Sequence, residues 1–294
     1  MADAISDYPR QLGRSARKRI GLPASGDVGT LGNMIKALKR EAEKLAVKPV
    51  TSALISVPHI VAMYDEDVVD AFEYVGLQYT WLNHWRGLFW ENAMGYAGYG
   101  LGLCSDYKNF TACWKEVNSS KRQPVFATTL TSNALITSFA VLQCVFGLWE
   151  PQYRMNVNVD LGYDFREEDG YWVRVRGELH QLFNSFPGFP RPTVVYIMGD
   201  KAEDPTFQNL IHELADTWGT NPPLYTNDTT FAVARGAAEM KKRAPYIGKG
   251  SPNTTEDSDS QMKLSMLDQG NDAWLHTLNV QTQKSPLRTS ELAE

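Results

Sequence analysis

The segment around residues 38–77 constrains the fold most, because three structural signals follow one another in it. The first is a helix whose apolar residues recur every three or four positions beside a charged face. That apolar stripe consists of Met34, Ile35, Leu38, Ala42 and Leu45. A strand over Ser52–Val57 follows and ends at Pro58, and a second helix begins at Asp65 as its cap and ends at Gly76. This order predicts an α/β architecture, in which helices cover strands.

Runs of β-branched and aromatic residues predict the remaining strands. Buried strands are expected at residues 50–57, 125–130, 136–145 and 193–198, and the short segment 131–133 predicts a hairpin between the second and the third. Further helices are predicted over residues 171–183, 205–218 and 229–243, and a polar loop over residues 108–124. We expect the helices that contain Leu38, Phe72 and Leu210 to cover the strands.

The order of these segments resembles the nucleotide-binding domain of the seventy-kilodalton heat-shock chaperones, which belong to the actin-like ATPase superfamily. Residues 38–77 match that family's run of helix, strand and helix. Residues 91–101 are similar to its first connecting helix, residues 194–207 to its adenosine loop, and residues 231–238 to its second connecting helix. The resemblance covers about residues 30–244 and implies an actin-like ATPase (ribonuclease H-like) fold that is truncated at the N-terminal lobe.

Three regions are expected along the chain. Residues 1–29 are polar and predict a loose arm. The resemblance makes residues 30–124 the remnant of a first lobe and residues 125–247 the second lobe. Residues 248–294 are rich in Ser, Thr, Asn, Gln and Asp and predict a disordered tail. The abrupt start leaves a second interpretation open, in which the chain is a fragment of a longer protein.

Composition excludes several partners. The net charge of -5 gives no overall attraction to nucleic acid or anionic lipid, and the locally basic residues 10–48 are interpreted as a solvated helix face. The longest apolar run, residues 134–149, is shorter than the ~20 residues that span a bilayer and predicts a buried strand. No apolar core follows the charged N-terminus, as a secretory signal would require, so a cytoplasmic protein is expected.

The side chains that bind metals or carry out catalysis elsewhere form no familiar pattern here. The three cysteines, Cys104, Cys113 and Cys144, are widely spaced, which predicts neither a disulfide framework nor a zinc site, and indicates a reduced compartment. The glycine-rich run from Gly95 to Gly102 has neither the G-x-G-x-x-G nor the G-x-x-x-x-G-K spacing. Neither H-E-x-x-H nor G-x-S-x-G occurs, so no metal site and no hydrolase elbow are predicted.

The resemblance implies ATP or ADP with magnesium as the ligands, held by two glycine-rich hairpins whose backbone amides approach the phosphates. The first hairpin should precede residue 38, and nothing there resembles it. At the second, where the family has "DLGGGTFDVS", this chain has Thr129 for the aspartate and Thr131, Ser132 and Asn133 for the glycines. A rival placement at Asp160, which begins the sequence Asp-Leu-Gly, copies the first three letters.

The adenosine loop matches the family pattern more closely than the phosphate-binding hairpins do. Gly199 matches its first glycine, whereas Asp200 replaces the second and would repel phosphates or cap the next turn. The helix that begins at Asp204 and Pro205 is expected to offer free amides to a polar group. Glu91 matches the glutamate that the family places near the catalytic water, and the alternative role is that of a partner for groups at a helix start.

The sequence therefore predicts a degenerate heat-shock-chaperone-like protein, a non-catalytic pseudo-ATPase that acts through a protein partner and uses neither nucleic acid nor membrane. The alternative is an active ATP-binding or ATP-hydrolysing protein with non-standard ligands. The hairpin at Thr129–Ser138 separates the two possibilities, because its side chains occupy the place of the phosphates.

Overall fold

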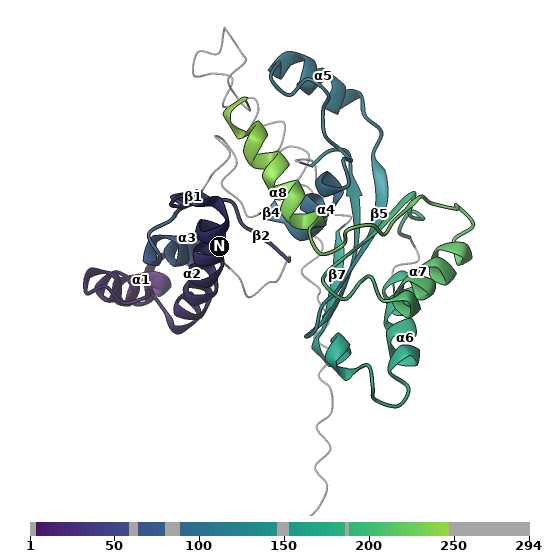
Figure 1. Cartoon of the computed structure of the whole chain (residues 1–294), viewed down its shortest axis with the longest axis horizontal. Coiled ribbons are helices and arrows are strands. Elements are labelled where there is room, and N and C mark those ends of the chain that lie inside the picture. The colour runs from purple at the N-terminus through teal and green to yellow at the C-terminus, as the bar shows by residue number, and fades with distance from the viewer. Residues whose placement is uncertain (1–3, 59–63, 80–88, 146–152, 186–187, 247–294) are drawn as a thin grey trace, which may run out of the picture. The chain divides into compact units, whose positions relative to one another are not determined.

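The computed structural model describes residues 4–58, 64–79, 89–145, 153–185 and 188–246, which form an α/β protein (Figure 1). Its helices are α1 (Ala4–Arg19), α2 (Gly26–Ala46), α3 (Asp65–Tyr74), α4 (Glu91–Gly98), α5 (Phe110–Ser119), α6 (Tyr171–Asn184), α7 (Pro205–Thr217) and α8 (Ala232–Arg243). Its strands are β1 (Ser52–Ala53), β2 (Ser56–Val57), β3 (Gln78–Tyr79), β4 (Phe89–Trp90), β5 (Gln123–Leu130), β6 (Leu135–Leu142), β7 (Arg154–Asn158), β8 (Val194–Met198) and β9 (Leu224–Tyr225). Single 3-10 turns lie at Val159–Leu161, Tyr163–Phe165 and Ala244–Tyr246.

Five strands form a mixed sheet in the order β7-β6-β5-β8-β9. β5, β6 and β7 form an antiparallel meander, and β8 and β9 continue the sheet parallel to β5. The strands predicted at residues 125–130, 136–145 and 193–198 and the hairpin between the first two are therefore confirmed, although β6 ends at Leu142. Thr129 lies opposite Ile136 on β6 and Met198 on β8, so β5 is the central strand.

Both faces of this sheet are covered, because successive side chains of its inner strands point to opposite faces and most are apolar. On one face, α6 and α7 pack against Phe126 and Phe139, with Trp218 between them. The predicted apolar face of α7 is confirmed and is fully buried: Phe207, Leu210, Ile211, Leu214 and Trp218. On the other face, α4 and α8 pack against Ala127, Ala140 and Tyr196.

α4 and α8 cross at glycines, which lets their backbones approach closely. A Cβ atom at Gly98 would lie 1.8 Å from the Ala232 carbonyl oxygen, and one at Gly236 would lie 1.8 Å from the Met94 carbonyl oxygen. Neither position therefore accommodates a side chain without a shift of one helix. The two segments similar to the chaperone connecting helices thus lie in direct contact.

The expectation of a loose arm over residues 1–29 is wrong, because α1 occupies most of it. Arg14 of α1 is buried and donates to Asp67 and Asp70 of α3 at 2.6 Å each, and Lys18 lies 2.7 Å from Asp70. α1 thus contacts α3 through charged side chains rather than through an apolar stripe. A search for apolar periodicity therefore does not detect this helix.

The predicted apolar face of α2 is confirmed only at Ile35 and is wrong at Met34, Leu38, Ala42 and Leu45, which are exposed. The side that packs against α3 contains Val28, Gly32 and Ile35, whereas Leu38 is exposed to solvent. The predicted strand over residues 50–57 is two separate strands of two residues, β1 paired in parallel with β3 and β2 paired in parallel with β4, and neither joins the five-stranded sheet.

α3 follows the prediction except at its start. Tyr64 rather than Asp65 is the residue before the first turn, and it provides no side-chain cap. Val68 and Phe72 are buried as expected. Gly76 has φ +65°, and the Leu77 amide donates to the Phe72 carbonyl, which completes the predicted glycine C-cap.

Two further expectations are corrected around α5. The predicted polar loop over residues 108–124 contains this helix, which Asn109 caps by accepting a bond from the Ala112 amide at 3.1 Å. Cys104 and Cys113 form a disulfide, contrary to the prediction from their spacing. The tertiary structure decides this pairing, because the turn before α5 brings the two Cα atoms to 5.1 Å.

The predicted disordered tail, residues 248–294, lies outside the described residues. Among the helices that the structure describes, none combines the length and the apolar character needed to cross a bilayer.

Candidate functional site

Two residues that the sequence places in separate motifs meet at the end of the central strand. Glu91 is the first residue of α4, and Thr129 is the second-last residue of β5. The Thr129 hydroxyl donates to the Glu91 carboxyl oxygen Oε1 at 2.8 Å. The threonine at the position of the family's aspartate therefore binds the glutamate that the resemblance places near the catalytic water.

The surroundings of Glu91 favour its neutral form. Burial raises the pKa of the Glu91 carboxyl above its ordinary 4.5, and the hydrogen bond from Thr129 opposes that shift. Burial also raises the pKa of the Tyr153 hydroxyl, and the negative charge of ionised Glu91 raises it further. The Tyr196 hydroxyl donates to the Asn92 carbonyl at 2.5 Å. The carboxyl thus lies among phenol groups and helix backbone, with no Lys or Arg side chain hydrogen-bonded to it among the described residues.

Most backbone amides of the turn between β5 and β6 donate hydrogen bonds within the turn itself. The Thr131 amide donates to the Ala134 carbonyl at 3.0 Å. The Thr131 hydroxyl accepts bonds from the amides of Asn133 and Ala134 at 3.3 and 3.1 Å. Three of the four amides from residue 131 to residue 134 are therefore hydrogen-bonded within the turn. A phosphate cradle needs such amides free to point at the ligand.

The rival placement at Asp160 lies against this same turn. The amides of Tyr163 and Asp164 donate to the carbonyls of Thr131 and Ser132 at 2.9 and 3.1 Å. A Cβ atom on Gly162 would lie 2.5 Å from the Ser132 carbonyl oxygen. Asp160 itself is exposed. The Asp-Leu-Gly segment therefore covers the hairpin turn and is not a separate glycine-rich hairpin.

Gly199 joins the site through the last residue of β5. Its φ is +103°, and a Cβ atom there would lie 2.2 Å from the Leu130 carbonyl oxygen, so only glycine fits. Thr229 uses both backbone groups of this glycine: its carbonyl accepts from the Gly199 amide at 3.1 Å, and its hydroxyl donates to the Gly199 carbonyl at 2.8 Å. The close approach that the resemblance implies is present, but it serves β5 and Thr229.

The two acidic residues after Gly199 lie apart from the buried site. Asp200 is exposed, and its carboxylate lies 3.4 Å from the Lys201 ammonium group. Asp204 caps α7, because its carboxylate accepts from the amides of Thr206 and Phe207 at 2.8 and 3.1 Å. The expectation of free amides at this helix start is therefore wrong for these two positions.

The structure thus brings together Glu91, Thr129 and Gly199 around the end of β5. Thr131, Ser132 and Asn133 lie in the adjoining turn. Sequence reasoning did not identify Thr229 as a site residue. Gly162 belongs to the rival Asp-Leu-Gly segment, but the sequence did not indicate that this segment contacts the hairpin turn. Among the described residues, no group of three or more His, Cys, Asp or Glu side chains is placed to hold a metal ion.

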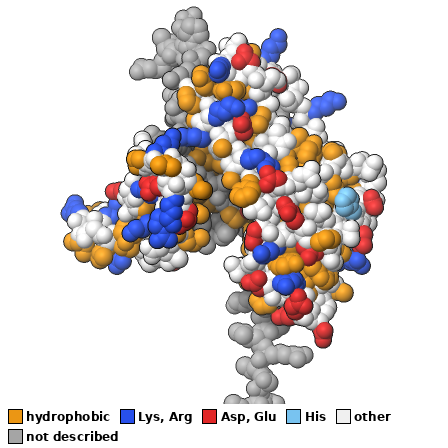
Figure 2. Space-filling view, viewed as in Figure 1, with side chains coloured by type: hydrophobic (Ala, Val, Ile, Leu, Met, Phe, Trp, Pro, Cys, Tyr) orange, Lys and Arg blue, Asp and Glu red, His pale blue; other side chains and the backbone are white. Residues whose placement is uncertain are grey.

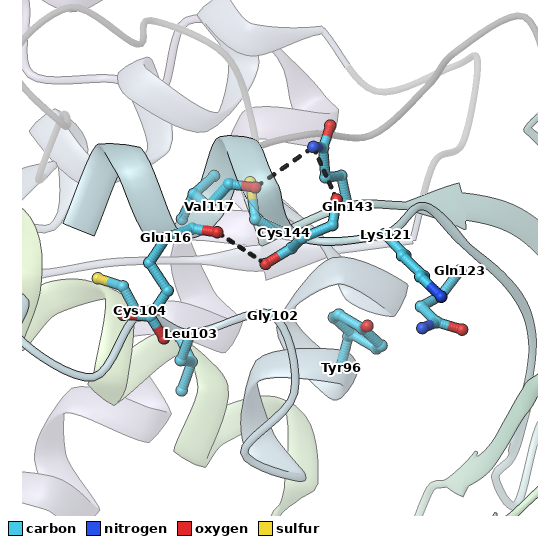
Figure 3. Close-up of a pocket in the computed structure, with 11 residues that line it drawn as sticks. Tyr96, Gly102, Leu103, Cys104, Glu116, Val117, Lys121, Gln123, Gln143 and Cys144 are labelled. Carbon is cyan, nitrogen blue, oxygen red and sulfur yellow. Dashed lines mark hydrogen bonds between the residues drawn. The ribbon is translucent and has the colours of Figure 1, made fainter. Parts of the chain in front are cut away.

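A cavity of about 330 Å³ lies elsewhere and contains none of these residues. It is lined by Gly102 and Leu103, by part of α5 and by the two residues that follow β6, and Figure 3 shows Gln143 bonded to the Val117 carbonyl at its edge. Lys121 and Tyr96 supply polar groups to it. The cavity therefore adds nothing to the residues of the predicted nucleotide site.

No protein-family model matches this chain, and no curated protein matches its sequence.

Proposed function

We propose that this chain is a degenerate member of the actin-like ATPase fold, a pseudo-ATPase that acts through contacts with a protein partner. The five-stranded sheet supports this proposal, because a meander of three antiparallel strands continued by two parallel strands, with helices on both faces, is compatible with a ribonuclease H-like lobe. The glycine-mediated crossing of α4 and α8 supports it further, since the resemblance makes these segments the two connecting helices.

The observation that best supports the proposed absence of catalysis is the hydrogen bonding of the hairpin turn. Three of its amides are used within the turn, and the segment around Gly162 lies on its carbonyls. Phosphoryl transfer depends on a close backbone cradle and on a carboxylate that orients magnesium. This turn provides no free cradle, and Thr129 stands where the carboxylate belongs. The half-buried Glu91, whose pKa is raised, already accepts the hydrogen bond of the Thr129 hydroxyl with one carboxyl oxygen.

Two measurements test the proposal. Purified protein should release no magnesium-dependent phosphate from ATP above a mock preparation. In calorimetry, adenosine should bind as well as ATP or better, because the charge of Asp200 opposes phosphates. Asp200→Gly should improve ATP binding selectively, by an amount on the order of 1 kcal/mol for one exposed charge. Tight, magnesium-dependent ATP binding that Asp200→Gly leaves unchanged would contradict the proposal.

An active ATP-binding or ATP-hydrolysing protein is the second candidate, favoured by the contact between Glu91 and Thr129 at a strand end beside Gly199. Turnover that is lost in Glu91→Gln would support it, because that substitution keeps the shape of the side chain and removes its acid. Turnover lost in Asp160→Asn would instead assign the metal-orienting role to the segment on the turn.

We propose the cytoplasm as the location of this protein. The disulfide between Cys104 and Cys113 argues against it, because the cytosol keeps thiols reduced. Acid quenching of intact cells, followed by alkylation of the denatured, unreduced protein, distinguishes the two: three alkylated cysteines indicate a reducing compartment, and one indicates an oxidising compartment.

A further inference from the structure

The three cysteines of the chain meet around the cavity beside α5. Cys104 and Cys113 form the disulfide, and Cys144, which follows β6, keeps its thiol. Cys104 and Cys144 are buried with Val117 in one small apolar cluster, against which Cys113 packs. Both buried cysteines line the cavity, and Figure 3 shows them together with Val117 of α5 at its wall. A disulfide and a thiol therefore lie within one compact part of the chain.

α5 is attached to the rest of the chain by few contacts. Val117 is the one buried residue among its ten, and most of the others are exposed to solvent at the top of Figure 2. α5 makes no extensive contact with another helix or strand that the structure describes. The apolar cluster that holds it is much smaller than the two clusters on the faces of the sheet. Burial of apolar surface therefore contributes little to keeping α5 in place.

Hydrogen bonds hold α5 at two places, mostly at the surface. The Glu116 carboxylate accepts from the amide and the hydroxyl of Ser105 at 2.9 Å each. The Gln143 side-chain amide donates to the Val117 and Ser120 carbonyls at 3.3 and 2.9 Å. Hydrogen bonds that exchange with water contribute little net stability. The covalent bridge is therefore the strongest link between α5 and the segment that lines the cavity.

The bridge is accessible from the side of α5. Cys113 is partly exposed, whereas Cys104 is buried at 6% exposure. An external thiolate can therefore attack the Cys113 Sγ and displace Cys104 as the leaving thiolate. The proposed cytoplasmic location supports such a reaction, since disulfides of cytosolic proteins are usually transient and redox-sensing.

We propose that the bridge between Cys104 and Cys113 is a reversible latch that holds α5 over the cavity, and that its reduction by a cellular dithiol frees α5 and exposes Cys144. The first thiolate of the dithiol forms a mixed disulfide with Cys113 and releases Cys104, which takes up a proton. The second thiolate then displaces Cys113 in the same way. The dithiol is oxidised to a disulfide, and the two cysteines gain two electrons and two protons.

The latch is separate from the proposed pseudo-ATPase, because the cavity contains none of the residues of the predicted nucleotide site. Its position also explains what it controls. The bridge closes a short loop between Cys104, at the cavity wall, and the first turns of α5, so it limits how far this helix can move away from Cys144.

The test measures how fast a maleimide alkylates Cys144 in the folded full chain. In the oxidised protein the reaction should be slow, because Cys144 is only 5% exposed. The protein is then reduced with the dithiol dithiothreitol, which is removed by anaerobic gel filtration. The rate at Cys144 should rise by about tenfold or more, because alkylation follows the fraction of molecules in which α5 is open. Reoxidation should restore the slow rate, and mass spectrometry of the Cys144 peptide separates this reaction from those of Cys104 and Cys113.

Two variants and a second measurement control for other effects. The double variant Cys104→Ser, Cys113→Ser should be alkylated at the fast rate without reduction. Arg14→Ala removes a contact between α1 and α3 that does not border the cavity, and it should keep the slow rate while the bridge is intact. Hydrogen exchange of the reduced, unaltered protein should show lost protection in α5 and retained protection in β5 and β6, whether or not the double variant folds.

Equal alkylation rates in the oxidised and the reduced protein would overturn the proposal, and so would a bridge that dithiothreitol does not reduce in the folded protein. A loss of protection that extends to β5 and β6 would overturn it as well, because the bridge would then support the whole fold. A fast rate in oxidised Arg14→Ala would have the same consequence, since general instability rather than the latch would then expose Cys144.

Discussion

Replacement of Gly236 by alanine should measurably lower the free energy of unfolding, because the glycine allows α8 to lie directly on the backbone of α4. The new Cβ atom would lie 1.8 Å from the Met94 carbonyl oxygen and 2.9 Å from the Gly98 amide nitrogen. Real Cβ contacts are not shorter than 3.0 Å, so the helices must separate by at least about 1.2 Å at this point. Both obstructing atoms belong to the backbone, and neither can rotate away.

The size of the effect follows from two opposing contributions. Overpacking of a well-packed contact costs about 3 kcal/mol at the upper end of the usual range. Alanine gains about 1 kcal/mol over glycine in a helix interior. The net loss should be about 2 kcal/mol in the free energy of unfolding, or about 4–8 °C in the melting temperature for a chain of this size.

Urea unfolding followed by circular dichroism measures this loss, and Gly177→Ala provides the control. Gly177 lies inside α6, and a Cβ atom there would meet nothing within 4 Å. That substitution should therefore gain the full helix contribution of about 1 kcal/mol. If Gly236→Ala is as stable as Gly177→Ala, α4 and α8 do not cross at these glycines, and the support they give to the connecting-helix assignment is lost.

Three further outcomes are expected. Arg14→Ala should lower the free energy of unfolding by about 3 kcal/mol, because Asp67 and Asp70 lose their buried partner. Limited proteolysis should then cut within α1, and unchanged protease resistance would refute the charged contact. Loss of the disulfide by Cys113→Ser should cost about 2–3 kcal/mol of the free energy of unfolding. The unaltered protein, denatured without reduction, should take up one alkyl group by mass spectrometry; three would refute the disulfide. Because the folded-state pKa of Glu91 is raised, the neutral carboxyl contributes to stability at low pH, and this contribution is lost as pH rises above 4.5 through the folded-state pKa. The melting temperature of Glu91→Gln should therefore fall less with rising pH than that of the unaltered protein. Identical pH profiles would exclude a raised pKa at Glu91.

Local patterns predict much of the sheet region. Asp204 and Pro205 fix the start of α7, since a carboxylate cap and a proline at the first helical position both act within a single turn. The hairpin between β5 and β6 is equally local, because β-rich runs flank three turn residues. The contact between Glu91 and Thr129 required the tertiary structure, since 38 residues separate them.

The N-terminal part shows where local pattern fails. Five apolar residues from Met34 to Leu45 predict a buried stripe, yet the structure buries only Ile35 among them, together with Val28 and Gly32 on the neighbouring side of α2. Gly32 decides this, because the absence of a side chain there lets the helix approach Tyr74, and hydrophobic periodicity does not register a glycine. α1 was missed for a related reason: the carboxylates that hold Arg14 lie on α3, more than fifty residues away.

The sequence by itself determined strands β5, β6 and β8, helices α6, α7 and α8 and the loss of the glycines in the hairpin, but it did not indicate α5 or β7. These features depend on neighbours within a few residues, where side-chain type acts directly on the backbone. The tertiary structure alone decided that α4 and α8 cross backbone to backbone, that the segment at Gly162 covers the hairpin turn, and that Cys104 meets Cys113. Each of these depends on where two distant segments come to lie, which the packing of the whole sheet fixes and no local pattern contains.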